Sequence, residues 1–149
     1  MTGRPDFSLT EWQTVCLGPT YAGLMVSMAQ RGGFFWEVLT IARMFNEART
    51  ESSESQLLDD IVADRPRVER VRFRSPDEAQ AYSLERIGRA IEVIRKKGQA
   101  ADVAAFAGFM VNVAENVARA HAETGERVSQ AEKNALAEIR AAVGLDVNA

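Results

Sequence analysis

The chain has 149 residues, of which 46% are hydrophobic and 7% aromatic, which suits one domain with an apolar core. Its net charge of -3 at neutral pH argues against a domain that binds nucleic acid. The single cysteine excludes an internal disulfide, and no apolar run approaches the roughly 18 residues that span a bilayer. Because the opening residues also lack the apolar core of a signal peptide, we expect a cytoplasmic protein.

Helix signals run along most of the chain, and no segment predicts a sheet. The expected helices cover 8–17, 19–30, 34–50, 53–64, 76–97, 100–123 and 129–143. Gly18-Pro19 either separates the first two or kinks one long helix, so the total is six or seven. Capping boxes, with serine followed three positions later by Glu or Gln, are predicted at Ser8, Ser53, Ser75 and Ser129. Gly125 and Gly144 are expected to end helices in the left-handed conformation.

One stretch of sequence occurs twice. Residues 22–30 read AGLMVSMAQ and residues 107–115 read AGFMVNVAE, with identical Ala, Gly, Met, Val and Ala. A second match follows each copy: Glu37 with Ile41-Ala42, and Glu132 with Leu136-Ala137. Two copies of a helix pair favour a pseudo-symmetric helical domain, since a solenoid needs about three repeats or more.

We therefore predict an all-α fold, with a single domain of six or seven helices over 1–149 and a pseudo-twofold internal repeat. Its halves would cover about 8–64 and 76–145, joined by an arginine-rich linker at 65–75.

The linker carries the only dense charge cluster in the sequence. Its candidate partner-binding residues are Arg65, Arg67, Arg70, Arg72, Phe73 and Arg74. The arginines could bind phosphates or an acidic partner, with Phe73 as an anchor. The alternative is a solvated connector, neutralised by the preceding acidic residues Glu47, Glu51, Glu54, Asp59 and Asp60.

No residue pattern predicts catalysis, and we expect no cofactor. His121 is the only histidine, and its neighbours three and four positions away are not strong metal ligands. Cys16 lies between Val15 and Leu17, which predicts a buried apolar role rather than a nucleophile.

The last predicted helix supports a family resemblance. Residues 126–139, with Val143-Gly144-Leu145 after them, resemble the final helix of TerB-like (tellurite-resistance TerB) domains. The opening residues 7–12, together with Gly18-Pro19, resemble a group of uncharacterised bacterial proteins of similar length. This resemblance implies an all-helical domain of about seven helices with internal duplication.

The resemblance also implies a divalent-metal site at the repeat loops, from which this sequence departs. Arg31 and Thr124 stand where the family carries aspartate, and only Glu37 and Glu132 are retained. A hard cation needs several oxygen ligands, so we predict no metal site, with Glu37 and Glu132 as the candidates if one exists.

The leading functional prediction is a non-enzymatic interaction or stress-response module. A protein partner is expected, a homodimer is possible, and neither nucleic acid nor a membrane is expected. The alternatives are a divalent-metal-responsive TerB-like domain, and a small-ligand binder or enzyme that uses a pocket between helices.

Overall fold

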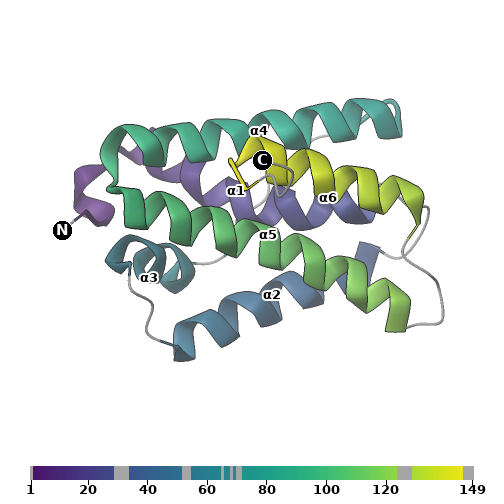
Figure 1. Ribbon diagram of the computed structural model, residues 1–149, viewed down its shortest axis with the longest axis horizontal. Helices are drawn as coiled ribbons and strands as arrows, with labels where there is room; N and C mark the ends of the chain where they lie inside the picture. The colour runs from purple at the N-terminus through teal and green to yellow at the C-terminus, as the bar shows by residue number, and fades with distance from the viewer. Residues whose placement is uncertain are drawn as a thin grey trace.

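The structure is a computed structural model that describes residues 2–28, 34–51, 55–64, 66–67, 69, 72–123 and 129–145. Within these residues the side chains at 28, 34–38 and 121–123 are not described. The described chain is all helical, without a strand, which confirms the predicted fold class. Its elements are η1 (Arg4–Asp6), α1 (Leu9–Met28), α2 (Phe34–Thr50), α3 (Gln56–Ala63), α4 (Pro76–Lys97), α5 (Ala100–Glu123) and α6 (Gln130–Ala142) (Figure 1).

Two of the predicted capping boxes form in full. At the start of α1, Glu11 N donates to Ser8 Oγ at 3.1 Å, and Ser8 N donates to Glu11 Oε1 at 2.8 Å. At the start of α6, Glu132 N donates to Ser129 Oγ and Ser129 N donates to Glu132 Oε1. These bonds satisfy amides that have no partner inside the helix, which is why the helices begin where the sequence predicts.

Of the other two predicted boxes, one forms only in part and one involves a serine that the structure does not describe. Ser75 accepts a hydrogen bond from Glu78 N, but the Glu78 carboxylate accepts from Arg74 N rather than from the serine amide. Ser53 lies outside the described residues. The third helix of the structure begins at Gln56 rather than 53, because Ser55 caps it through Leu58 N and is itself held by Asp102 on α5, at 2.7 Å.

The first two predicted helices are one helix. Pro19 lies inside α1, so the open choice at Gly18-Pro19 is resolved as one long helix and six α-helices in the described chain. A Cβ atom placed at Gly18 would lie 2.7 Å from Ala90 Cβ on α4 and 3.0 Å from Met110 Sδ on α5. The helix is thus continuous although Pro19 removes one backbone hydrogen bond, and at Gly18 it packs closely against both α4 and α5.

The core lies where α1 packs against α4 and α5. Met25, Ile87, Ile91 and Met110 are fully buried there. In Figure 1, α4 runs along one side of α5, while α2 and α3 lie along the opposite side. The open surface described below lies on the α2–α3 side.

The described residues of the two copies of the repeated sequence lie on α1 and α5, and the glycines of the two copies have different surroundings. A Cβ atom placed at Gly23 would lie 2.7 Å from Ile41 Cδ1, so α2 covers that position closely. At Gly108 no atom of the described residues comes within 4 Å of the same place. The internal repeat stays a prediction from sequence, but the difference leaves an uncovered space on α5.

As for membranes, none of the helices in the described chain combines the length and the apolar character needed to cross one.

Candidate functional site

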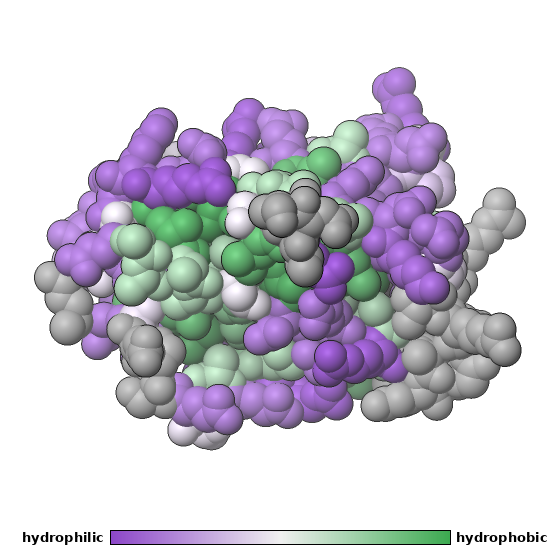
Figure 2. Space-filling model, in the orientation of Figure 1, coloured by the Kyte–Doolittle hydropathy of each residue, from purple (hydrophilic) through white to green (hydrophobic). Residues whose placement is uncertain are grey.

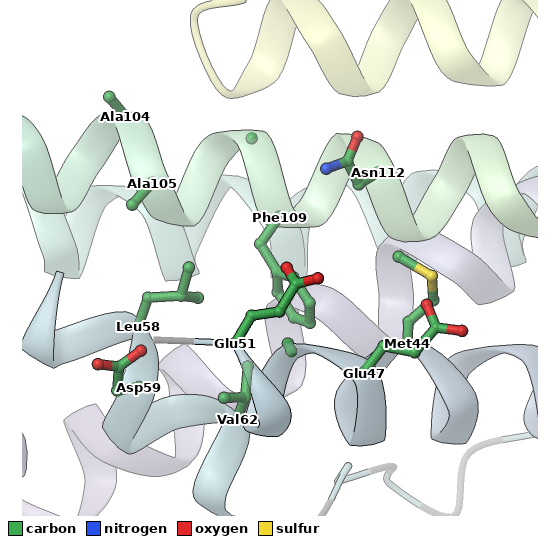
Figure 3. A pocket seen from close by; sticks show the side chains of 12 residues that line it. Met44, Glu47, Glu51, Leu58, Asp59, Val62, Ala104, Ala105, Phe109 and Asn112 are labelled. Carbon is green, nitrogen blue, oxygen red and sulfur yellow. The ribbon is translucent and has the colours of Figure 1, made fainter. Parts of the chain in front are cut away.

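A groove with a cavity volume of about 360 Å³ lies on the surface between α5 and the α2–α3 pair (Figure 3). Its apolar lining includes Met44 from α2, Leu58 and Val62 from α3, and Ala104, Gly108 and Phe109 from α5. Figure 2 shows apolar residues reaching the surface where α5 faces α3, with hydrophilic residues bordering them along α2. The groove thus has an open apolar floor with hydrophilic residues along its α2 edge.

The α5 wall is low because its side chains are small. Ala104, Ala105 and Gly108 share one helix face with Asn112, since residues three or four positions apart lie one above the other. Phe109 forms the bulkiest part of the floor, and its ring meets that of the buried Phe45 edge-on, at 5.3 Å between centroids. The floor is therefore fixed by the core beneath it.

The opposite lip is acidic. The groove is lined by Glu47 on α2, by Glu51 just after the end of α2, and by Asp59 on α3, and by no Lys, Arg or His of the described chain. Figure 3 shows Glu47 and Glu51 rising from the α2 side toward α5. Arg43 lies beside Glu47, with 3.7 Å between Nε and Oε1, but the Glu47 side chain remains 62% exposed. The lip thus presents carboxylates above an apolar surface.

A neighbouring hollow extends the groove around the α2–α3 edge, and its lining includes one positively charged side chain. Arg49 lines this hollow, but its guanidinium donates to the backbone oxygens of Val62 and Asp64 and to Asn46 Oδ1. The hydrogen bonds of the Arg49 guanidinium therefore connect α2 to the end of α3.

The described part of the arginine linker is tied to the domain. Glu69 accepts a hydrogen bond from Tyr82 Oη at 2.7 Å and pairs with Arg86 Nε at 3.1 Å. Phe73 packs on the same Tyr82 ring, at 5.3 Å between centroids, and Arg67 pairs with Asp64 at 3.0 Å.

The remaining linker residues are divided between exposed and undescribed positions. Arg72 and Arg74 are exposed, and Arg65 and Arg70 lie outside the described residues. The neutralising partner of Arg67 is thus Asp64, which the sequence did not single out. Partner binding by the linker stays a prediction.

Asp64 also lies beside the buried thiol of Cys16 and affects its pKa. Its Oδ2 accepts a hydrogen bond from Trp12 Nε1 at 3.1 Å and lies 4.0 Å from Cys16 Sγ. Burial, with the nearby Asp64 charge as a second cause, raises the pKa of the Cys16 thiol to about 12. The thiol is therefore protonated at neutral pH, and its burial confirms the buried position that the sequence predicts for Cys16.

Glu132, one of the two conditional metal candidates, is fully buried and its Oε1 accepts the Ser129 amide. The side chains of Glu37 and His121 lie outside the described residues. In the part of the chain that is described, no three His, Cys, Asp or Glu side chains gather to hold a metal ion. Glu132 therefore serves the start of α6, and a site shared with Glu37 stays a prediction.

Comparison with family models, with curated proteins and with solved structures finds no significant match to this chain. Sequence reasoning named Glu47, Glu51 and Asp59 only as neutralising charges and did not single out Gly108 as part of a site. The only sequence signal for the groove was a glycine that shares one helix face with alanines, which predicts a wall of small side chains. The arrangement suits binding: apolar contacts can supply affinity, and the acidic lip can select the charge of the ligand.

Proposed function

We propose that the protein is a non-enzymatic interaction module that binds a protein partner in the α2–α3–α5 groove. The supporting observation is the juxtaposition of an apolar floor with an acidic lip on one open face. Grooves of this kind commonly mark interaction sites on small domains, because exposed apolar area otherwise has no compensating contact.

The polar groups of the groove are carboxylates and one amide, which suit the binding of a ligand of opposite charge. General acid–base or nucleophilic catalysis needs a base or nucleophile within hydrogen-bond reach of a reacting atom. The polar lining of the groove consists of Glu47, Glu51, Asp59 and the Asn112 amide, with the carboxylates on the lip. Cys16 is buried on α1 among core residues.

The arginine linker is the second candidate surface for a partner. Arg72 and Arg74 are exposed, so an acidic partner could reach them. The likeness to TerB-like domains and a role in stress response stay predictions, and neither is needed for binding in the groove.

The experiment is site-specific cross-linking in cells that express the full chain. A photoreactive amino acid at Ala104, on the groove wall, should capture a defined protein, whereas the same group at Ala81, exposed on α4, should not. Adding Gly108→Leu should abolish capture, because the new side chain enters open space in the groove.

Two controls separate groove binding from the alternatives. Gly88→Leu places the same side chain on α4, where the space around the glycine is equally open, and should leave capture intact. The variant Arg67, Arg70, Arg72 and Arg74→Ser should also bind. If the arginine variant loses the partner while Gly108→Leu keeps it, the linker is the interface and the groove assignment is wrong.

A further inference from the structure

The groove wall on α5 has the length of a short helical contact. Ala104 to Asn112 covers about 12 Å of helix axis at 1.5 Å per residue, which matches about two turns of a partner helix. We propose that the occupant is a basic amphipathic helix of a partner protein, an inference that rests on the proposed binding function of this groove.

The domain itself shows how a helix can cover such a wall. Gly23 and Gly108 occupy matching positions in the repeated sequence, and Ile41 of α2 packs directly over Gly23. The space above Gly108 is uncovered by the described chain, and Leu136, the sequence counterpart of Ile41, does not fill it. A branched apolar side chain of an incoming helix would fill this space as Ile41 fills the space at Gly23.

Small residues along the wall allow the incoming backbone to come close. The distance between packed helices depends on the side chains at the contact, and here they are Ala104, Ala105 and Gly108. Apolar residues spaced three and four apart on the partner would meet this wall together with Leu58 and Phe109.

The lip determines the charge of the occupant. Glu47 on α2 and Glu51, which directly follows the last residue of α2, line the groove together with Met44, and Asp59 continues the acidic edge on α3. Lys or Arg residues flanking the apolar stripe of the partner helix would lie against these carboxylates. Exposed ion pairs contribute weakly, about twofold in affinity each, so their main effect is to select basic over acidic helices.

The test uses defined peptides and the full-length protein. The probe is a fluorescein-labelled amphipathic helix of about 18 residues, with leucines spaced by three and four and lysines beside them. One comparison peptide carries glutamates in place of the lysines, and another has the basic composition in scrambled order. Fluorescence anisotropy should show binding of the amphipathic basic peptide and at least tenfold weaker binding of both comparisons.

Groove variants then locate the binding. Gly108→Leu should weaken the basic peptide by about tenfold or more, and Gly88→Leu should leave its affinity unchanged. Removing the lip charges with Glu47→Gln, Glu51→Gln and Asp59→Asn should cost on the order of tenfold.

A second triple variant controls for net charge. Asp77→Asn, Glu85→Gln and Glu92→Gln make the same chemical changes at exposed positions of α4 and should have little effect. Asp77 lies in the first turn of α4 as Asp59 does in that of α3, so the two triples carry a similar structural cost. Thermal unfolding of each variant checks that it folds.

Three results would overturn the inference. Equal binding of the acidic or scrambled peptide would show that neither charge nor helical pattern is selected. Undiminished binding to Gly108→Leu would show that the peptide lies elsewhere. If no peptide binds but the Ala104 cross-linker captures a protein, the occupant class is wrong and the proposed function stands; if neither occurs, both fail.

Discussion

Single glycines show most directly how this sequence controls its packing. Gly18 lets α1 touch α4, since a Cβ atom there would lie 2.7 Å from that of the fully buried Ala90. Gly108 has no described neighbour at the equivalent distance, although it too lies inside a helix. Close helix packing thus requires glycine at position 18, whereas the space beside Gly108 would accept a side chain.

Gly18→Ala and Gly108→Ala should therefore change stability in opposite directions. Gly18→Ala forces two helices apart and should lower the free energy of unfolding by about 1–3 kcal/mol. Gly108→Ala meets no clash and should raise it by about 0.5–1 kcal/mol, because alanine loses less backbone entropy in a helix. Urea unfolding of both variants measures this, and changes of the same sign would contradict the packing described.

At the scale of elements, the start of α1 is fastened to the end of α4. Glu11 Oε1 accepts a hydrogen bond from Lys97 Nζ at 2.6 Å, and the same ammonium donates to the Asp6 backbone oxygen at 2.9 Å. The Lys97 bond, followed by the Ser8 amide, lowers the pKa of Glu11 from 4.5 to about 2. The contact thus joins a helix cap to a distant helix end.

This contact should give stability a specific acid dependence. Because the folded pKa of Glu11 lies below its ordinary value, its contribution is fully present above pH 4.5 and is lost as pH falls toward about 2. Glu11→Gln should reduce the fall of Tm across that window, and Lys97→Gln should act similarly. Thermal scans between pH 2 and 7 check this; a Glu11→Gln variant with the full original acid dependence would contradict it.

At the scale of the whole molecule, stability should follow the layering. The α1, α4 and α5 helices share the fully buried core, whereas α3 is an eight-residue helix at its edge, in contact with α2, α5 and η1. Local opening requires less energy where fewer apolar contacts are broken.

Hydrogen exchange should therefore be slowest in α1 and α5 and faster in α3. Mass spectrometry of peptides from the full chain measures this difference under native conditions. Equal protection of α3 and α5 would mean that the edge layer opens only with the core. If α3 exchanges faster than α5, the groove wall formed by α3 opens more readily than the wall formed by α5.

Local signals in the sequence were sufficient for most helix boundaries. The boxes at Ser8 and Ser129 and the left-handed Gly144, at φ +79°, depend on residues only a few positions apart. The local sequence left continuity through Pro19 open, and the contact of Gly18 with α4 involves residues that lie far along the chain.

The sequence by itself determined an all-helical chain and most of its helix starts and ends, since capping and helical periodicity act over three or four residues. Only the tertiary structure decided that α1 is a single helix and that the acidic lip of α2 and α3 faces the small-residue wall of α5. Glu51 and Gly108 line one groove although two whole helices, α3 and α4, and the linker separate them in sequence. Their approach depends on how the helices pack around the core, and no local pattern encodes that distance.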